Sequence, residues 1–332
     1  MQEEKLDRAY GCLVGAAIGD AMGMPASFFT RAQVKRTYGY IEDFLEPEVT
    51  AQQCHGALHA GEVTDDTQES MIIADILIKK GGFEEEAFQE SMRRWAVEHQ
   101  MLESTVIGPS TRRFLTALVE GKDPKEGAKL GDTNGSAMRV APIGLRYWSE
   151  LDACVEAAAK SSLPSHGSAP AVAAACAVAV ACAAGVGGAY TPEQIMDKAM
   201  QAAEYGEMLG YDICAPSVSK RIAMAKRIVD EKRTDGLSAI LDELVGIFGA
   251  SMKAYESVPI ALGVFYAVDG NAKDGILAAI NAGDDADTNG SICGAICGAY
   301  SGASVLPKEW IQRVEHTSGI DFSEMAERLL GM

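Results

Sequence analysis

The feature that most limits the fold is a run of 21 residues without a charge, at positions 169–189. Its sequence, APAVAAACAVAVACAAGVGGA, is long enough to cross a bilayer. It is mostly alanine, however, with four Gly or Pro residues and no Leu, Ile or Phe, so lipid insertion would be weakly driven. No basic segment flanks it to fix an orientation. We therefore expect a helix buried inside a globular protein, with other backbones packed closely against its small side chains.

The composition narrows the class of protein. The chain has 332 residues, 48% hydrophobic and 23% charged, which is typical of a folded protein of one large or two ordinary domains. A net charge of −18 argues against a nucleic-acid partner. The eight cysteines form no CxxC pair, and the first residues, MQEEKLDRAY, are unlike a signal peptide. We expect a cytoplasmic protein with no membrane partner.

Apolar residues at helical spacing dominate the chain, and alternating β patterns are nearly absent. We predict an all-α, compact, single-domain protein over residues 1–332, with a candidate mobile loop at 26–63. Its oligomeric state is left open. Helices are expected at 3–23, 64–82, 84–100, 110–120, 151–160, 168–184, 192–208, 215–231, 236–254, 258–268, 273–281, 289–303 and 308–315.

Two acidic clusters stand at the starts of apolar helices. The stretch GDDADTNG covers residues 283–290, and TDDT covers residues 64–67. Helix capping accounts for one or two Asp or Thr residues at each start, but not for so many carboxylates together. Hard cations such as Mg²⁺ and Mn²⁺ bind carboxylate, hydroxyl and water oxygens. The pair of clusters favours a metal site over capping alone.

Other metal sites fit less well. An EF-hand would need a twelve-residue loop that ends in Glu, and neither cluster has one. Zinc is disfavoured because His55 and His59 have no cysteine at ligand spacing. We expect these two histidines to line a loop or cap a helix.

A third stretch, GDTNGSAMRVAPIGL at residues 131–145, opens with a glycine turn. Backbone amides in such a turn can bind an anion or a sugar diphosphate, although glycine turns are common. His166 precedes the uncharged run, where a lone histidine is more often a cap or a core residue than a ligand.

Together these stretches resemble the ADP-ribosylglycohydrolase family. GAAIGDAMGMP resembles its opening helix, TDDTQ its first metal motif and GDTNGSAMRVAPIG its substrate loop. ESVPIAL at 256–262 resembles a late helix motif, and DADTNGSICGAICGA the second metal motif. The matches follow the family's order over roughly residues 9–310. The resemblance implies an orthogonal multi-helix bundle with two Mg²⁺ or Mn²⁺ ions.

The resemblance also implies roles for particular residues. One ion would be held by Thr64, Asp65, Asp66 and Asp287, and the other by Asp285, Asp287 and Thr288, with Asp287 as the bridge. Asp65, Asp66 and Asp287 would be catalytic, in the cleavage of a glycosidic bond at ribose C1. The implied substrate-binding residues are Asn134, Gly135, Ser136, Ala137, Met138 and His166.

The chain departs from the family pattern at two positions. Ser27 stands where active members often have a glutamate near the scissile bond, and Asp284 stands where glycine is usual. The first departure puts the substrate in question. The expected substrate is an ADP-ribosylated protein or small molecule. Two alternatives are a small ribosyl N-glycoside without the diphosphate, and a catalytically silent ADP-ribose-binding protein.

Overall fold

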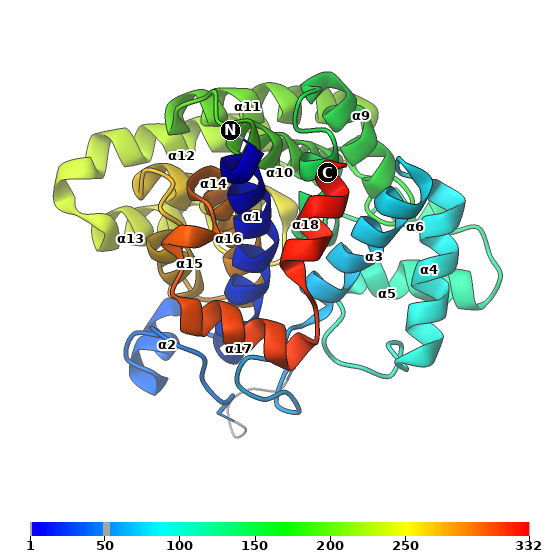
Figure 1. The fold of residues 1–332 in the computed structure, drawn as a ribbon, viewed down its shortest axis with the longest axis horizontal. Helices are drawn as coiled ribbons and strands as arrows, with labels where there is room; N and C mark the ends of the chain where they lie inside the picture. The colour runs from blue at the N-terminus through cyan, green and yellow to red at the C-terminus, as the bar shows by residue number, and fades with distance from the viewer. Residues whose placement is uncertain (1, 49–53, 332) are drawn as a thin grey trace.

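The computed structural model describes residues 2–48 and 54–331, and this part of the chain is all-α, with isolated β-bridges but no strand. Figure 1 shows α1 (Gln2–Gly23) running through the middle of the bundle, with both chain ends on the same side. The other helices are α2 (Arg31–Thr37), α3 (Asp65–Lys80), α4 (Glu85–Glu98), α5 (Pro109–Val119), α6 (Lys125–Ala128), α7 (Gly135–Met138), α8 (Ala141–Arg146), α9 (Leu151–Ser162), α10 (Ala169–Gly187), α11 (Pro192–Leu209), α12 (Val218–Lys232), α13 (Leu237–Phe248), α14 (Ala254–Ala267), α15 (Ala272–Ile280), α16 (Ala286–Ser301), α17 (Lys308–Ser318) and α18 (Phe322–Leu330).

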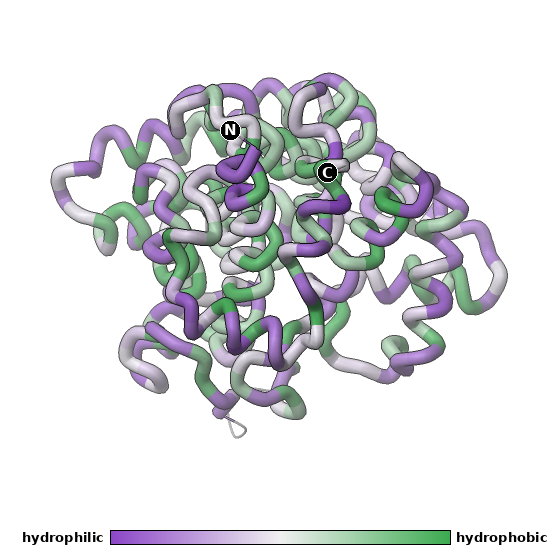
Figure 2. The backbone as a smooth tube through the Cα atoms, in the orientation of Figure 1, coloured by the Kyte–Doolittle hydropathy of each residue, from purple (hydrophilic) through white to green (hydrophobic). Residues whose placement is uncertain are grey.

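The uncharged run forms α10, as expected, and this helix lies inside the protein. By length and composition it is the one helix of the described residues that could cross a membrane, yet 94% of its apolar window is buried within the fold. It packs against α8, α9, α11, α14 and α16. Figure 2 shows the hydrophobic segments gathered toward the middle of the bundle and the hydrophilic ones toward its rim. Small side chains on α10 let these neighbours approach closely.

The closest helix pair joins α1 to α16 through two facing rows of glycines. Gly15 and Gly19 on α1 lie against Gly294 and Gly290 on α16, and a Cβ at any of these positions would overlap a backbone carbonyl of the other helix. Gly11 and Gly298 continue the rows. The two backbones are therefore in direct contact, which brings the C-terminal end of α1 beside the N-terminal end of α16.

Gly19→Ala is expected to destabilise the fold by about 1–3 kcal/mol or more, because the added methyl meets the Gly290 carbonyl and the backbones must separate. Gly246→Ala on α13 is the matched control. A Cβ there meets nothing within 4 Å, so the change is expected to stabilise the protein by about 0.5–1 kcal/mol. Urea unfolding measures both. Equal effects of the two substitutions would contradict the packing argument.

The helix predictions differ from the structure at identifiable places. The helix expected over 236–254 ends at Phe248, because Gly249 adopts a positive φ of 76° and breaks it. Within the predicted loop 26–63, residues 31–37 form α2, which a Thr30–Gln33 capping box starts; residues 49–53 lie outside the described residues. Sequence reasoning also missed α6, α7, α8 and α18, the first three of which are six residues or shorter.

Candidate active site

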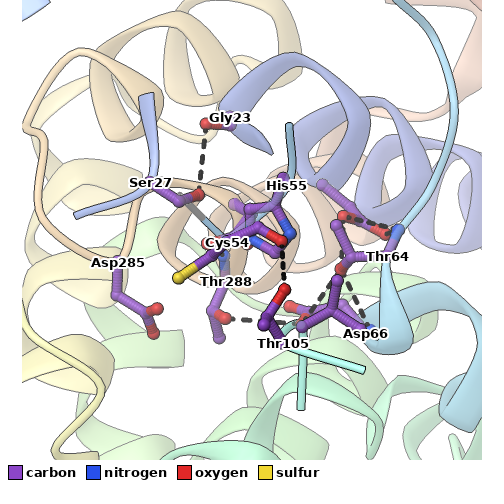
Figure 3. A network of polar contacts seen from close by, with 12 residues as sticks. Gly23, Ser27, Cys54, His55, Thr64, Asp66, Thr105, Asp285 and Thr288 are labelled. Atoms are coloured by element: carbon purple, nitrogen blue, oxygen red, sulfur yellow. Dashed lines mark hydrogen bonds and ion pairs between the residues drawn. The ribbon is translucent and has the colours of Figure 1, made fainter. Parts of the chain in front are cut away.

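Three parts of the chain meet at the acidic centre. They are the end of α1, the start of α3 and the start of α16, and the loop before α3 lies across them (Figure 3). Thr64 caps α3 by accepting a hydrogen bond from the Asp66 amide, and Asp285 stands at the N-cap of α16. The sequence places carboxylates here because Asp and Thr favour helix starts.

Asp20 joins the end of α1 to the start of α3. Its carboxylate accepts hydrogen bonds from the Thr64 hydroxyl at 2.8 Å and from the Thr67 hydroxyl at 2.5 Å, and also from both backbone amides. The Asp20 side chain is fully buried. It therefore fixes the first turn of α3 to α1. Sequence reasoning gave Asp20 no role, although it lies in the segment that resembles the family's opening helix.

Neighbouring polar groups orient the carboxylates of α16. The Asn134 amide donates to Asp285 Oδ2 at 2.6 Å and to Ser257 at 3.1 Å. The Thr288 amide donates to Asp287 Oδ1 at 3.0 Å, and the Thr288 hydroxyl lies 3.4 Å from Asp66 Oδ1 on α3. Asp66 Oδ2 is buried and has no hydrogen-bond partner among the described residues.

A small inner cavity of about 40 Å³ opens among these groups. That is room for a few water-sized ligands rather than for a sugar. Eight of the twelve predicted site residues line it, namely Asp65, Asp66, Asn134, Gly135, Met138, Asp285, Asp287 and Thr288. The rest of its wall consists of Phe28, His55, Val106, Gly108, Thr111, Thr133 and Met252. Among the described residues, no lysine or arginine lines the cavity.

The other four predicted site residues do not line this cavity. Thr64 contacts Asp20 and Asp66 behind it, and Ala137 is buried in the hydrophobic core. Ser136 donates to the carbonyl of Ala171, and the Ser162 hydroxyl donates to Ser136. The substrate-loop segment is a helical turn, α7, so only one of its faces can point at the cavity.

His166 is fully buried and held at both ring nitrogens. Nδ1 lies 2.8 Å from the Ser165 hydroxyl, and Nε2 lies 3.1 Å from the Thr133 hydroxyl. Burial, with the nearby positive charge of Arg139, lowers its pKa well below the ordinary value, so the ring is neutral. His166 supports the wall residue Thr133. His166 itself does not line the cavity.

The cavity carboxylates are costly to ionise. Burial, and next the charge of Asp287, raise the pKa of Asp285 to about 8. Burial raises the pKa of Asp20 to about 6 despite the donating threonine hydroxyls. Burial and neighbouring carboxylates also raise the pKa values of Asp65 and Asp66 well above the ordinary range. A bound cation would relieve this cost.

Asp287 is the exception in the cluster. Burial opposes its ionisation, but contact with His55 and the Ser27 hydroxyl holds its pKa below the ordinary value. His55 Nε2 lies 2.9 Å from Asp287 Oδ2. Ser27, which stands where the family pattern has glutamate, is thus fully buried and contacts the Asp287 carboxylate. Figure 3 shows Ser27 and His55 close to the acidic residues, with the Ser27 hydroxyl also donating to the Gly23 carbonyl at 3.5 Å.

Asp284, the other departure, has no place in the cavity wall. Its backbone adopts a left-handed φ of 57° and pairs with Phe28 and Phe29. Its side chain is half-buried, and burial raises its pKa. Asp tolerates a left-handed backbone better than most residues, so Asp284 serves the turn that presents Asp285.

The metal-free protein is expected to lose stability as pH rises from about 4 to 8. The pKa values of Asp20 and Asp285 are higher in the folded than in the unfolded protein. Their contribution to stability is therefore fully present below the unfolded-state pKa and is lost as pH rises through the folded-state pKa. Each of these carboxyls lowers the unfolding free energy by about 1.4 kcal/mol per pH unit between its unfolded and its folded pKa, the latter about 6 for Asp20 and about 8 for Asp285. Thermal unfolding in EDTA from pH 5 to 8.5 measures the slope.

The matched variant for this measurement is Asp285→Asn, which removes one ionisation and keeps the side-chain shape. Its stability is expected to fall less steeply than that of the wild type between pH 5 and 8. Identical slopes would show that Asp285 ionises normally in the folded chain.

Comparison with known proteins identifies the family. A family model described as ADP-ribosylglycohydrolase matches residues 1–332. The chain belongs to the ADP-ribosylglycohydrolase family. It is 30% identical to the uncharacterized protein YegU of Escherichia coli (strain K12), covering 98% of this chain and 97% of that protein.

The chain is also similar to a named hydrolase and to a solved structure. The ADP-ribosylarginine hydrolase Tri1 of Pseudomonas putida (strain GB-1) is 26% identical over 94% of this chain and 75% of its own length. A solved structure, an ADP-ribosylglycohydrolase-related protein complex, matches 99% of both chains with a TM-score of 0.71 and 25% identity. The all-α fold predicted from the sequence is thereby confirmed.

Proposed function

We propose that the chain hydrolyses the glycosidic bond at ribose C1 of an ADP-ribosylated protein or small acceptor, with two Mg²⁺ or Mn²⁺ ions in the cavity. The observation that carries the proposal is the set of four buried carboxylates in its wall, three with raised pKa values. Carboxylate and hydroxyl oxygens are the donors that such cations prefer. The unpartnered Asp66 Oδ2 fits a ligand role.

In this proposal one ion is held by Thr64, Asp65, Asp66 and Asp287, and the other by Asp285, Asp287 and Thr288. In the described part of the chain, no three His, Cys, Asp or Glu side chains already converge on one metal position. Carboxylates repel one another without a cation, so we expect ion binding to draw them together.

The ions supply Lewis-acid activation of water and of the ribose hydroxyls when bound. The chain's own groups hold the donors in place: the Asn134 amide fixes Asp285 and the Thr288 amide fixes Asp287. Phe28, Val106, Met138 and Met252 give the wall an apolar part that limits access of bulk water. Exclusion of water strengthens the electrostatic interactions inside the site.

The decisive experiment incubates the protein with Mg²⁺ or Mn²⁺ and a panel of ADP-ribosylated and ribosylated acceptors, and measures released ADP-ribose or ribose. Metal-dependent release of ADP-ribose is expected, and EDTA should abolish it. Binding of ADP-ribose without release from any acceptor would instead identify a silent binding protein.

One observation favours a second candidate, a hydrolase of a small ribosyl N-glycoside without the diphosphate. Arg139, the basic residue of the substrate loop, is fully buried and pairs with Glu69 at 2.6 Å, so it does not face the cavity. ADP-ribose at about 100 times its Kd should stabilise the fold by about 2.7 kcal/mol if the diphosphate is recognised. Stabilisation by ribose or a nucleoside alone would select the second candidate.

Ser27→Glu is expected to lower native activity. Ser27 is fully buried beside Asp287, so a larger, charged side chain would crowd the centre and add a further carboxylate to it. The measurements are kcat/KM on the identified substrate and the Mn²⁺ Kd from calorimetry.

Ser27→Gln separates bulk from charge, because glutamine has the size of glutamate without its charge. A fall in native activity with Gln equal to the fall with Glu would assign the effect to bulk alone. A tenfold or greater rise in ADP-ribosyl hydrolysis by Ser27→Glu, with metal binding unchanged, would contradict the expectation. It would show instead that the pocket has kept room for a catalytic glutamate, whose rate contribution is on the order of 10² to 10⁴.

A further inference from the structure

His55 is a buried side chain that no part of the proposed chemistry has used. Its exposed fraction is 2%, and it lines the same cavity as Asp65, Asp66 and Asp285. Neither ring nitrogen has a hydrogen-bond partner among the described residues. Burying a polar group without a partner is unfavourable, so this ring needs an explanation.

His166 shows what a structural histidine looks like in this protein. It is as deeply buried as His55, but each of its ring nitrogens has a hydroxyl partner, from Ser165 and Thr133. His55 has only the 2.9 Å approach of Nε2 to Asp287 Oδ2, and this contact is not directed as a hydrogen bond. Nδ1 of His55 therefore has no protein partner among the described residues, and Nε2 has only this ion-pair contact with Asp287.

The distance between His55 Nε2 and Asp287 Oδ2 is one that two ligands of the same ion would have. Octahedral cations hold ligand atoms at about 2.0–2.1 Å, so two neighbouring ligands at a right angle are about 3.0 Å apart. The observed 2.9 Å equals that separation, but it is also an ordinary length for an ion pair, so the direction of the ring has to decide between the two. A hydrogen bond would aim the ring N–H at the oxygen, whereas two ligands of one ion both aim at a third point.

We infer that His55 supplies an imidazole nitrogen ligand to the ion that Asp287 holds, which makes this a mixed nitrogen and oxygen site. The inference rests on the proposed metal centre and adds to it the class of metal. Imidazole suits transition metals, and affinities of nitrogen-containing sites rise along the first-row series, while Mg²⁺ prefers oxygen ligands. The site should therefore prefer Mn²⁺ or a later first-row divalent ion to Mg²⁺.

The test is pulsed electron paramagnetic resonance of the Mn²⁺-loaded protein, which detects a directly coordinated ¹⁴N nucleus. The wild type is expected to show this coupling, and labelling its histidines with ¹⁵N should change it. His55→Gln should lose the coupling. His59→Gln is the matched control, because His59 lies four residues away with a 77% exposed side chain that pairs with Glu46, and it should keep the coupling.

Calorimetry gives a second readout. His55→Gln is expected to weaken Mn²⁺ binding by at least the roughly 10–100-fold lost when outer-shell partners of a ligand are removed, and to weaken Mg²⁺ binding less. Mn²⁺ bound to the wild type without nitrogen coupling would overturn the role of His55 and leave the metal centre standing. Failure of the wild type to bind any divalent ion would remove the metal centre as well.

Discussion

Asp287→Asn is expected to lower kcat/KM by about 10³-fold, since metal ions stabilise transition states by several kcal/mol and about 1.4 kcal/mol corresponds to a factor of ten. Asp287 is the carboxylate proposed to bridge both ions, and it is the one member of the cavity cluster whose pKa is lowered. Losing the bridge should reduce metal content at both sites. Elemental analysis after dialysis, together with steady-state kinetics, measures the two effects.

Asp284→Asn is the control for that variant. It removes the same charge three positions earlier, just before α16, from a side chain that does not line the cavity. Asn also tolerates the left-handed backbone at this position. Metal content and activity are expected to stay within twofold of the wild type. Full metal occupancy in Asp287→Asn would contradict the binuclear proposal.

Arg139→Met should destabilise the protein by about 3–5 kcal/mol, because it leaves the buried Glu69 without its partner. Both side chains have an exposed fraction of zero. Arg139 also donates to the Ser165 hydroxyl at 2.6 Å and lies over the Phe88 ring. Urea unfolding of the metal-free protein measures the change.

Two further variants isolate the cause. Arg93→Met breaks an exposed pair, Arg93–Glu90 at 2.8 Å, and should cost less than about 1 kcal/mol. The double variant Arg139→Met with Glu69→Leu removes both buried charges and should recover most of the loss. A double variant as unstable as Arg139→Met alone would show that packing of the arginine, rather than charge pairing, dominates.

Local sequence signals were sufficient to find the metal-site candidates. Asp65, Asp66, Asp285 and Asp287 stand at helix starts within short acidic motifs, and the structure brings them to one cavity. Their convergence could be predicted because neighbouring carboxylates repel one another unless a cation lies between them. The helices themselves followed from apolar spacing, since long buried helices leave a strong periodic signal.

The remaining parts of the site depend on tertiary contacts that no local pattern carries. Asp20 is the one charged residue in the second half of α1, and its role appears only when α1 lies beside α3. The sequence predicted that His55 lines a loop or caps a helix, because no cysteine lies at zinc-ligand spacing from it. Its burial depends on how the segment before α3 folds back over the centre.

The glycine rows on α1 and α16 set the order in which the protein can mature during synthesis. Gly19 and Gly290 are 271 positions apart in the sequence. At roughly 5–20 residues per second, the ribosome makes α16 about 15–55 s after α1. Throughout that time the glycine face of α1 has no α16 to pack against. The acidic centre is therefore one of the last features to form on the nascent chain, and catalysis must wait for nearly complete translation.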